Sequence, residues 1–208
     1  MKIVTISDTH SLHQDVSVPE GDVLIHAGDV SREGTLEEVK QFNDWLKDLT
    51  HEYKILVPGN HDFCFEDPRR RDRARDLLTE AQCLIDDDLT IEGVRFWGAP
   101  WQPKFFDWAF NRERGRSLRK KWSLVPEDVD VLVTHGPPRG IGDRVAQGDR
   151  VGCFELRKRV FEVQPDYHVF GHIHEGYGRY AQQGVEFLNA SVCDVYREPR
   201  NAPLVFTL

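Results

Sequence analysis

Apolar side chains recur along the chain in short blocks, and the spacing within each block predicts an element. Mostly apolar runs at 2–7, 22–27, 53–57, 129–134 and 167–170 are typical of buried strands. Apolar positions three or four residues apart follow Thr35 and recur over 154–163, which predicts helices. Thr35 and Glu38 form a capping-box pattern, in which hydroxyl and carboxylate satisfy the first N–H groups of a helix, so the first helix is expected to begin there.

Less regular segments complete the pattern. Charged stretches at 67–79 and 112–122 predict two more helices, and segments 89–91 and 95–98 predict a hairpin around Glu92 and Gly93. The end of the chain, 177–208, predicts short strands with turns at 182–184 and 199–201. A chain of 208 residues is long enough for one domain with a substantial core and short for two. We therefore expect a single α/β domain over residues 1–208, with two packed mixed sheets flanked by helices.

Polar residues of the kinds that bind metals follow five of the predicted strands. The five motifs are Asp8-Thr9-His10, Gly28-Asp29, Gly59-Asn60-His61-Asp62, His135-Gly136 and Gly171-His172-Ile173-His174. Side chains two residues apart in an extended segment point the same way, so each D-x-H or H-x-H pair converges on one point. Because the carboxyl ends of strands in an α/β sheet meet at one edge, we expect the five motifs to build a single site.

The donors in these motifs predict a site for two metal ions. Seven side chains qualify: Asp8, His10, Asp29, Asn60, His135, His172 and His174. This mixed oxygen and nitrogen set without thiolate suits Mn²⁺, Fe²⁺ or Zn²⁺. Seven donors are too many for one open catalytic ion, but they suit two ions that share a carboxylate and clamp the attacking and leaving oxygens of a phosphoryl transfer. The motifs therefore predict a metal-dependent phosphoester hydrolase.

The order of the motifs resembles the signature of the calcineurin-like metallophosphoesterase superfamily. Further segments, 97–103, 134–138, 151–153, 170–178 and 189–193, resemble its metallophosphoesterase-domain-containing protein branch, which includes class III cyclic-nucleotide phosphodiesterase-like enzymes. The resemblance extends from residue 3 to residue 208 and implies a four-layer α/β/β/α sandwich with the metals at a sheet edge. Some members of the branch lack the first histidine of G-H-x-H and bind metal poorly. Because His172 is present, a competent site is expected.

The resemblance also implies a role for each site residue. One ion would be held by Asp8, His10, Asp29 and His174, and the other by Asp29, Asn60, His135 and His172, so that Asp29 bridges the two. Mn²⁺ is the first expectation, with Fe²⁺/Fe³⁺ or Zn²⁺ as alternatives. His61, together with Asn60, resembles the catalytic pair, and His61 would lie beside the leaving-group oxygen. The mechanism expected is in-line attack by a hydroxide held between the ions, with His61 protonating the departing alkoxide.

Several functions remain open within this chemistry. The leading hypothesis is a phosphodiesterase for small, nucleotide-like substrates, including 2′,3′- or 3′,5′-cyclic nucleotides. The alternatives are a phosphomonoesterase or a phosphoprotein phosphatase with the same site. A non-catalytic scaffold is disfavoured because His61 and all seven ligands are present. The net charge of −8 argues against a stable nucleic-acid partner. No apolar run is long enough for a membrane span or a secretory signal, so a cytoplasmic protein with four free thiols is expected.

Residues outside the motifs give weaker predictions. Trp101, in the aromatic-rich segment 97–110, is the candidate for stacking on a substrate ring, against the alternative that these aromatics pack the core. Arg139, just after His135, is the candidate cation for substrate. The basic stretches 69–75 and 112–121 contain acids and are interpreted as solvated helix faces. The histidines interpreted as structural are His13, His26, His51 and His168, and Cys64 is interpreted as a buried thiol. A supporting role for Asp62 or Asp194 is left open.

Overall fold

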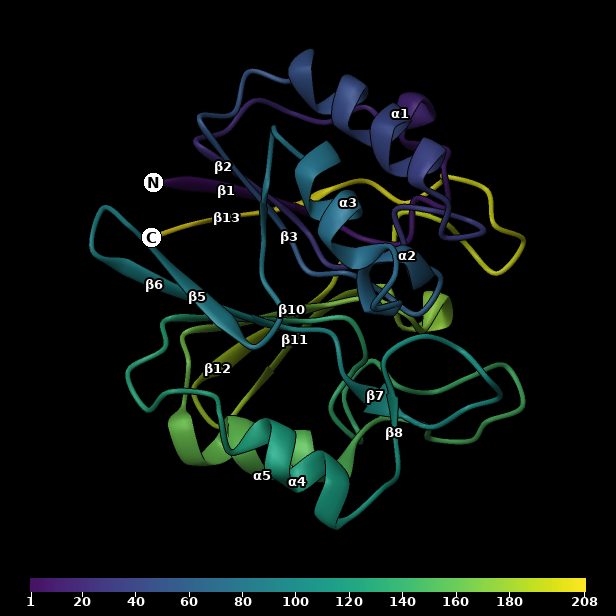
Figure 1. Cartoon of the computed structure of the whole chain (residues 1–208). Coiled ribbons are helices and arrows are strands. Elements are labelled where there is room, and N and C mark those ends of the chain that lie inside the picture. Colours follow the sequence, from purple (N-terminus) through teal and green to yellow (C-terminus); the bar gives the residue numbers. More distant parts are fainter.

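Two mixed β-sheets stacked on each other form the centre of the computed structural model, which describes residues 1–208 (Figure 1). The first sheet has the order β13-β1-β2-β3-β4 and the second the order β11-β12-β10-β9-β6-β5. The first sheet consists of β1 (Lys2–Ile6), β2 (Val23–His26), β3 (Tyr53–Leu56), β4 (Gln82–Cys83) and β13 (Leu204–Thr207). The second consists of β5 (Asp87–Ile91), β6 (Val94–Ala99), β9 (Val131–Thr134), β10 (Tyr167–Phe170), β11 (Gly178–Gln182) and β12 (Val185–Asn189).

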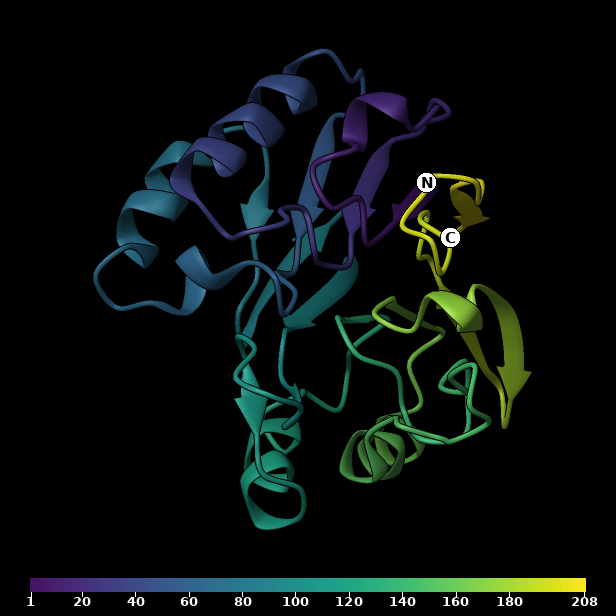
Figure 2. The same ribbon diagram turned by 90° about the vertical axis from the view of Figure 1, so that its right-hand side faces the viewer.

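Helices cover the outer face of each sheet, which completes four layers (Figures 1 and 2). On the first sheet lie α1 (Leu36–Lys47), α2 (Phe63–Glu66) and α3 (Arg71–Leu77). On the second lie α4 (Arg116–Trp122) and α5 (Phe154–Val163). Two 3₁₀ turns, η1 (His13–Asp15) and η2 (His174–Gly176), and a short ribbon of β7 (Gln102–Pro103) and β8 (Asn111–Arg112) complete the elements. The predicted α/β/β/α sandwich is confirmed, and no helix combines the length and apolar character needed to span a bilayer.

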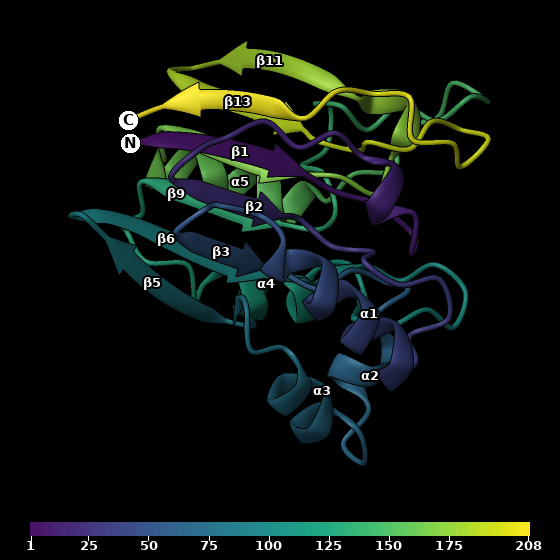
Figure 3. The same ribbon diagram turned by 90° about the horizontal axis from the view of Figure 1, so that it is seen from above.

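The central strands are buried on both faces, which explains why they are almost continuously apolar. In β2, Val23 and Ile25 pack in the core between the sheets, whereas Leu24 packs in the core beneath the helices. The edge strands β5, β11 and β13 are antiparallel to their neighbours, and the central strands are parallel. Parallel strands end on the same side of a sheet, so the loops after β1, β2 and β3 gather at one side of the molecule (Figure 3).

The predicted capping box is present at the start of α1. The Thr35 hydroxyl accepts the Glu38 N–H at 3.2 Å, and the Glu38 carboxylate accepts the Thr35 N–H at 2.9 Å. The apolar stripe of α1 then buries Val39, Phe42 and Leu46 against the first sheet. Such a cap contributes on the order of 1 kcal/mol.

Two predicted helices begin later than expected. The helix expected over 67–79 begins at Arg71, because the Asp67 carboxylate accepts the Arg69 N–H in a turn and a separate short helix, α2, precedes it. The helix expected over 112–122 begins at Arg116, because Arg112 pairs with Pro103 in the β7–β8 ribbon. The charge pattern alone revealed neither the turn at Asp67 nor the pairing of Arg112 with Pro103.

The other elements agree more closely with expectation. Helix α5 and strand β10 have the predicted bounds, and the strand expected over 129–134 begins at residue 131. The predicted turn between β11 and β12 places Gln183 and Gly184 at positive φ, 53° and 86°. All four cysteines are free thiols, and burial raises the pKa of Cys64 to about 12, which makes it an inert thiol.

Candidate metal centre

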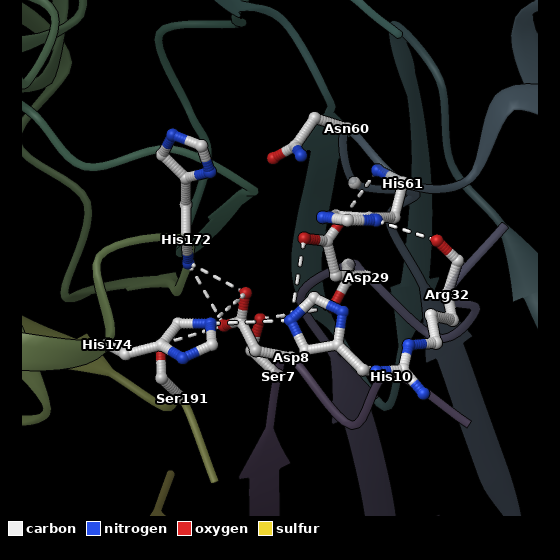
Figure 4. Close-up of polar contacts among 12 residues, drawn as sticks. Ser7, Asp8, His10, Asp29, Arg32, Asn60, His61, His172, His174 and Ser191 are labelled. Atoms are coloured by element: carbon white, nitrogen blue, oxygen red, sulfur yellow. Dashed lines mark hydrogen bonds and ion pairs between the residues drawn. The ribbon is translucent and has the colours of Figure 1, made fainter. Parts of the chain in front are cut away.

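The loops after β1, β2, β3, β9 and β10 bring the seven predicted donors to one edge of the sandwich. Figure 4 labels all of these donors except His135. The first sheet supplies Asp8, His10, Asp29 and Asn60, and the second supplies His135, His172 and His174. Five of the seven are fully buried, and His172 and His174 are half-buried. The site therefore lies at the seam between the two sheets.

One group of donors surrounds His10. The Nε2 atoms of His10 and His174 are 3.4 Å apart, His174 Nε2 is 3.6 Å from Asp8 Oδ1, and His10 Nε2 is 3.9 Å from Asp29 Oδ2. The donor atoms of Asp8, His10 and His174 all lie within 4.8 Å of one another. Together with Asp29, these are the residues that the family resemblance implied for the first ion.

A second group of donors surrounds His135. His135 Nε2 lies 2.8 Å from Asn60 Oδ1 and 3.5 Å from Asp29 Oδ1, and the rings of His135 and His172 are 5.0 Å apart. Asp29 thus directs Oδ2 at the first group and Oδ1 at the second. A carboxylate shared between two ions needs this placement.

Hydrogen bonds orient the imidazoles as they do in metal sites. His135 Nδ1 donates to the Ala27 carbonyl at 2.9 Å, and His174 Nδ1 donates to the Asp194 carbonyl at 2.8 Å. Both rings therefore present Nε2 to the cluster. Burial lowers the pKa of His172 to about 3, which keeps its ring neutral and available as a ligand.

Protonated imidazoles supply positive charge beside the buried carboxylates of this centre. Burial opposes a charge on His135, but the carboxylate of Asp29 outweighs it and raises the pKa of His135 to about 9. The same balance, with Asp8 as the main partner, raises the pKa of His174 to about 9. Two buried carboxylates surrounded by imidazoles thus attract positive charge, and the donor set fits divalent ions that would displace these protons.

Motif glycines allow the loops to approach one another. A Cβ on Gly59 would lie 2.2 Å from Asp29 Oδ1, and a Cβ on Gly171 would lie 2.2 Å from Asp8 Oδ2. The Asp8 carboxylate itself accepts hydrogen bonds from Ser191 Oγ at 2.7 Å and from the His172 N–H at 3.0 Å. Neither glycine tolerates a side chain without moving a ligand.

His61 lies beside both donor groups. Its N–H donates to Asp29 Oδ1 at 2.8 Å, and its ring Nδ1 donates to the Arg32 carbonyl at 2.8 Å, which turns Nε2 toward the cluster (Figure 4). The ring packs edge-on against His10 with centroids 4.8 Å apart and against Trp108 at 4.3 Å. His61 also lies close enough to His10 and Asp29 to share an ion with them.

Comparison with known proteins places this site in a family. A sequence profile described as calcineurin-like phosphoesterase matches residues 1–176. The chain belongs to the calcineurin-like phosphoesterase family. Metallophosphoesterase domain-containing protein 1 of Homo sapiens is 45% identical over 100% of this chain and 71% of the relative. UPF0046 protein T07D4.2 of Caenorhabditis elegans is 39% identical over 100% of this chain and 60% of the relative.

Solved structures agree with this assignment at the level of the fold. The protein TT1561 of Thermus thermophilus superposes with a TM-score of 0.60 at 13% identity, covering 91% of this chain and 88% of its own. Membership of the family and the buried His/Asp clusters together imply a metal-dependent phosphoester hydrolase.

Two carboxylates outside the donor set, Asp62 and Glu38, hold loops that carry residues of the phosphoesterase site. Asp62 is fully buried and accepts the N–H groups of Gly59, Asp29 and Ser31 at 2.7, 2.9 and 3.0 Å, so it ties the loop after β2 to the loop after β3. Burial, reinforced by the charge of Asp29, raises the pKa of Asp62 to about 6. This is the supporting role that the sequence left open.

Glu38 holds the loop that contains Arg32 and Glu33, next to His61. Besides capping α1, its carboxylate accepts the N–H groups of Arg32 and Glu33 at 2.7 and 3.1 Å and the hydroxyl of Ser11 at 3.0 Å. It thereby holds the loop whose Arg32 carbonyl orients His61. The capping box was visible in the sequence, but its connection to His61 depends on the tertiary fold.

The structure corrects the prediction for Trp101. Trp101 is 6% exposed, its Nε1 donates to Asp86 Oδ1 at 2.5 Å, and the cations of Arg112 and Lys121 lie over its ring at 4.0 and 3.8 Å. It is a core residue and has no free face for a substrate. The aromatic at the site of the phosphoesterase is Trp108, which the Ala109 N–H to Asn60 carbonyl bond (3.1 Å) brings against His61.

The remaining sequence candidates also have defined places. Arg139 is exposed and donates to the Arg150 carbonyl at 2.9 Å, whereas Arg114, which the sequence analysis did not single out, lines the cavity beside His172. His26 and His168 are buried and bonded to Thr9 and Thr134 at 3.0 and 2.9 Å, which agrees with their interpretation as structural histidines.

Proposed function

We propose that this phosphoesterase is a two-metal phosphodiesterase that hydrolyses small, nucleotide-like phosphodiesters, including 2′,3′- or 3′,5′-cyclic nucleotides. The observation that carries the proposal is the placement of Asp29, whose two oxygens face two separate groups of donors with His61 beside both. The preference for diesters draws support from a relative named probable glycerophosphodiester phosphodiesterase GpdQ of Arcobacter nitrofigilis, 30% identical over 63% of this chain.

Two sets of residues would hold the ions. We assign Asp8, His10, Asp29 and His174 to the first ion and Asp29, Asn60, His135 and His172 to the second, as the family resemblance implies. The contacts of His10 and His174 support the first set, and those of His135 with Asp29, Asn60 and His172 support the second. Mn²⁺ is the metal we propose, with iron or Zn²⁺ as alternatives for the same donors. When bound, such ions activate water and offset negative charge on the phosphoryl oxygens.

The residues of the chain supply orientation and a proton. The Arg32 carbonyl holds the Nδ1 proton of His61, so a second proton on this ring resides on Nε2, which faces the cluster. From there it passes to the oxygen of the departing alcohol as the bond to phosphorus breaks. Trp108 packs against this ring, and the Asp29 carboxylate holds the His61 backbone through its N–H.

Hydrolysis of model esters tests the proposal. Protein stripped with a chelator and reloaded with Mn²⁺ is assayed with bis-p-nitrophenyl phosphate and with p-nitrophenyl phosphate, and then with 2′,3′- and 3′,5′-cyclic nucleotides. We expect Mn²⁺-dependent hydrolysis with a higher kcat/KM for the diester. A preference for the monoester would make the protein a phosphomonoesterase, and a lack of any metal-stimulated hydrolysis would remove the enzymatic role.

A further inference from the structure

A cavity of about 310 Å³ opens beside His172 and is not used by the mechanism above. Its lining includes His172, a proposed ligand of the second ion, and the neighbouring residues Gly136, Pro137 and Ile173. The rest of the lining includes residues 103–105, Arg114, and the loop that contains Val145 and Val151. The cavity therefore borders the proposed metal centre at His172. The volume lies at the lower end of the range for small-molecule pockets, roughly 300–1,000 Å³.

An aromatic ring is held exposed on one wall. Phe105 is 60% exposed, and its backbone is clamped by Asn111, whose side chain accepts the Phe105 N–H at 3.3 Å and donates to the carbonyls of Phe105 and Phe106 at 3.2 and 3.0 Å. Phe106 adopts a φ of 48°, which is uncommon for an aromatic residue. An apolar ring kept in solvent by a built loop is a surface for stacking.

A cation without an acidic partner forms another part of the lining. The guanidinium of Arg114 donates to the carbonyls of Gly152 and Val151 at 3.0 and 2.8 Å, and no carboxylate lies within 4.0 Å of it. The other lining cation, Lys104, is paired with Glu113 at 3.1 Å, and Glu175 accepts the Ala146 N–H at 2.9 Å. Arginine has five N–H donors and no acceptor, so Arg114 keeps donors free for an acceptor-rich group.

We propose that this cavity binds the base of a nucleotide substituent and prefers guanine to adenine. Phe105 stacks on the base, and Arg114 donates to its acceptor edge. Guanine presents two adjacent acceptors, O6 and N7, whereas adenine replaces one of them with an amino donor that arginine cannot satisfy. The proposal rests on the proposed function because it names the substituent carried by the phosphodiester.

Binding of 5′-GMP and 5′-AMP, measured by titration calorimetry, tests the cavity separately from catalysis. We expect the wild-type protein to bind GMP about tenfold more tightly than AMP, which a bidentate arginine contact accounts for. Arg114→Ala should bring the two affinities to within about twofold of each other. Arg114→Lys, which keeps the charge and loses the fork, should lose the same preference. Phe105→Ala should weaken both nucleotides about tenfold through lost stacking.

Matched controls separate these effects from general damage. Phe154 is also 60% exposed, and Arg116 is an exposed arginine; neither residue lines the cavity. Phe154→Ala and Arg116→Ala should bind both nucleotides as the wild type does, and the Tm of every variant is measured alongside. Equal affinity of the wild type for GMP and AMP, a preference that survives in Arg114→Ala, or equal effects of Phe105→Ala and Phe154→Ala would each overturn the proposal.

The two proposals fail in different ways. If the wild type hydrolyses bis-p-nitrophenyl phosphate but shows none of the calorimetric differences, the phosphodiesterase stands and the base-binding cavity falls. If the calorimetric differences appear without hydrolysis of any ester, the cavity stands as a nucleotide site and the proposed enzymatic function falls.

Discussion

At the scale of single residues, Asp29 and His61 are neighbours with different tasks. The Asp29 carboxylate faces the donors around His10 with one oxygen and those around His135 with the other. His61 is tied to this carboxylate through its backbone N–H, and its ring is anchored separately on the Arg32 carbonyl. Under the proposed function, loss of Asp29 would remove a ligand of both ions, whereas loss of the His61 ring would remove the proton donor.

Substitution of each residue separates metal binding from proton transfer. Asp29→Ala should lose metal and activity together. His61→Ala should retain its metal and lose roughly 10²- to 10⁴-fold in kcat, the usual contribution of a general acid. Metal content by mass spectrometry, measured beside kcat on the same samples, distinguishes the two. A metal-free His61→Ala protein would show instead that His61 is a ligand, which its distance to His10 and Asp29 allows.

Trp108 offers a second test at this scale. Its ring packs on His61 with centroids 4.3 Å apart, so Trp108→Ala should leave metal content unchanged and reduce kcat through a less restrained histidine. Trp97→Ala is not a suitable control because Trp97 is buried in the core. Tyr196→Phe, at an exposed loop position, serves better and should have no effect. Equal kcat in Trp108→Ala and the wild type would show that the contact is dispensable.

At the scale of elements, the start of α1 both caps the helix and holds the loop next to His61. Glu38 closes the capping box and, through the Arg32 and Glu33 N–H groups, fixes the loop behind His61. Burial alone would raise the pKa of Glu38, but the hydrogen bonds from Thr35, Arg32 and Glu33 lower it to about 2. The ionised carboxylate is therefore the form that stabilises this part of the fold.

The sign of the pH dependence follows from this lowered pKa. The stability that Glu38 contributes is fully present above its ordinary pKa of 4.5 and is lost as pH falls through about 2. Glu38→Gln should therefore reduce the free energy of unfolding by about 1 kcal/mol at pH 7. In urea titrations at pH 7, 4 and 3, the difference in free energy of unfolding between Glu38→Gln and the wild type should become smaller as pH falls. Glu37→Gln, an exposed neighbour in the same turn, is the control; a difference independent of pH would contradict the account.

The clustering of the candidate donors was easier to predict from the sequence than the bounds of the elements around them. The sheet-edge position of Asp8, His10, His172 and His174 was predictable because each pair directly follows a buried strand. The extended backbone assumed for these pairs is absent, since Asp8, His10 and His172 have positive φ values of 58°, 44° and 68°. The start of α4 was not predictable, because it depends on Arg112 joining the β7–β8 ribbon. Trp101 lies in the core beside the same ribbon, and the Ala109–Asn60 backbone hydrogen bond places Trp108 next to His61, so the residue predicted to stack on substrate is buried. The start of α4 and the burial of Trp101 both depend on long-range contacts, which cannot be inferred from the local sequence pattern.

At the scale of the whole molecule, the site joins the two sheets. Asp8, His10, Asp29 and Asn60 come from the first sheet, and His135, His172 and His174 come from the second. Hydrogen bonds from Ser191 to Asp8 and from His135 to the Ala27 carbonyl already cross this seam beside the donors. A cation bound there would hold the two halves of the sandwich together more firmly.

Metal removal should consequently destabilise the fold. An ion that binds only the folded state raises the free energy of unfolding by RT ln(1 + [L]/Kd). For a micromolar Kd and a free metal concentration 100 times Kd, this increase is about 2.7 kcal/mol. We expect chelation to lower the Tm of the wild type by several degrees and to leave the Tm of Asp29→Ala unchanged. Calorimetric scans of both proteins with and without Mn²⁺ provide the comparison. Equal shifts in the two proteins would show that the metal acts elsewhere.

We propose that hydrolysis requires two ions that share Asp29. The most direct test of this proposal is a titration of the metal-stripped protein with Mn²⁺, in which bound metal and hydrolysis of bis-p-nitrophenyl phosphate are followed together. We expect activity to rise with the second equivalent and to saturate at two ions per chain. Saturation at one ion per chain, or binding of two ions without hydrolysis, would contradict the proposal.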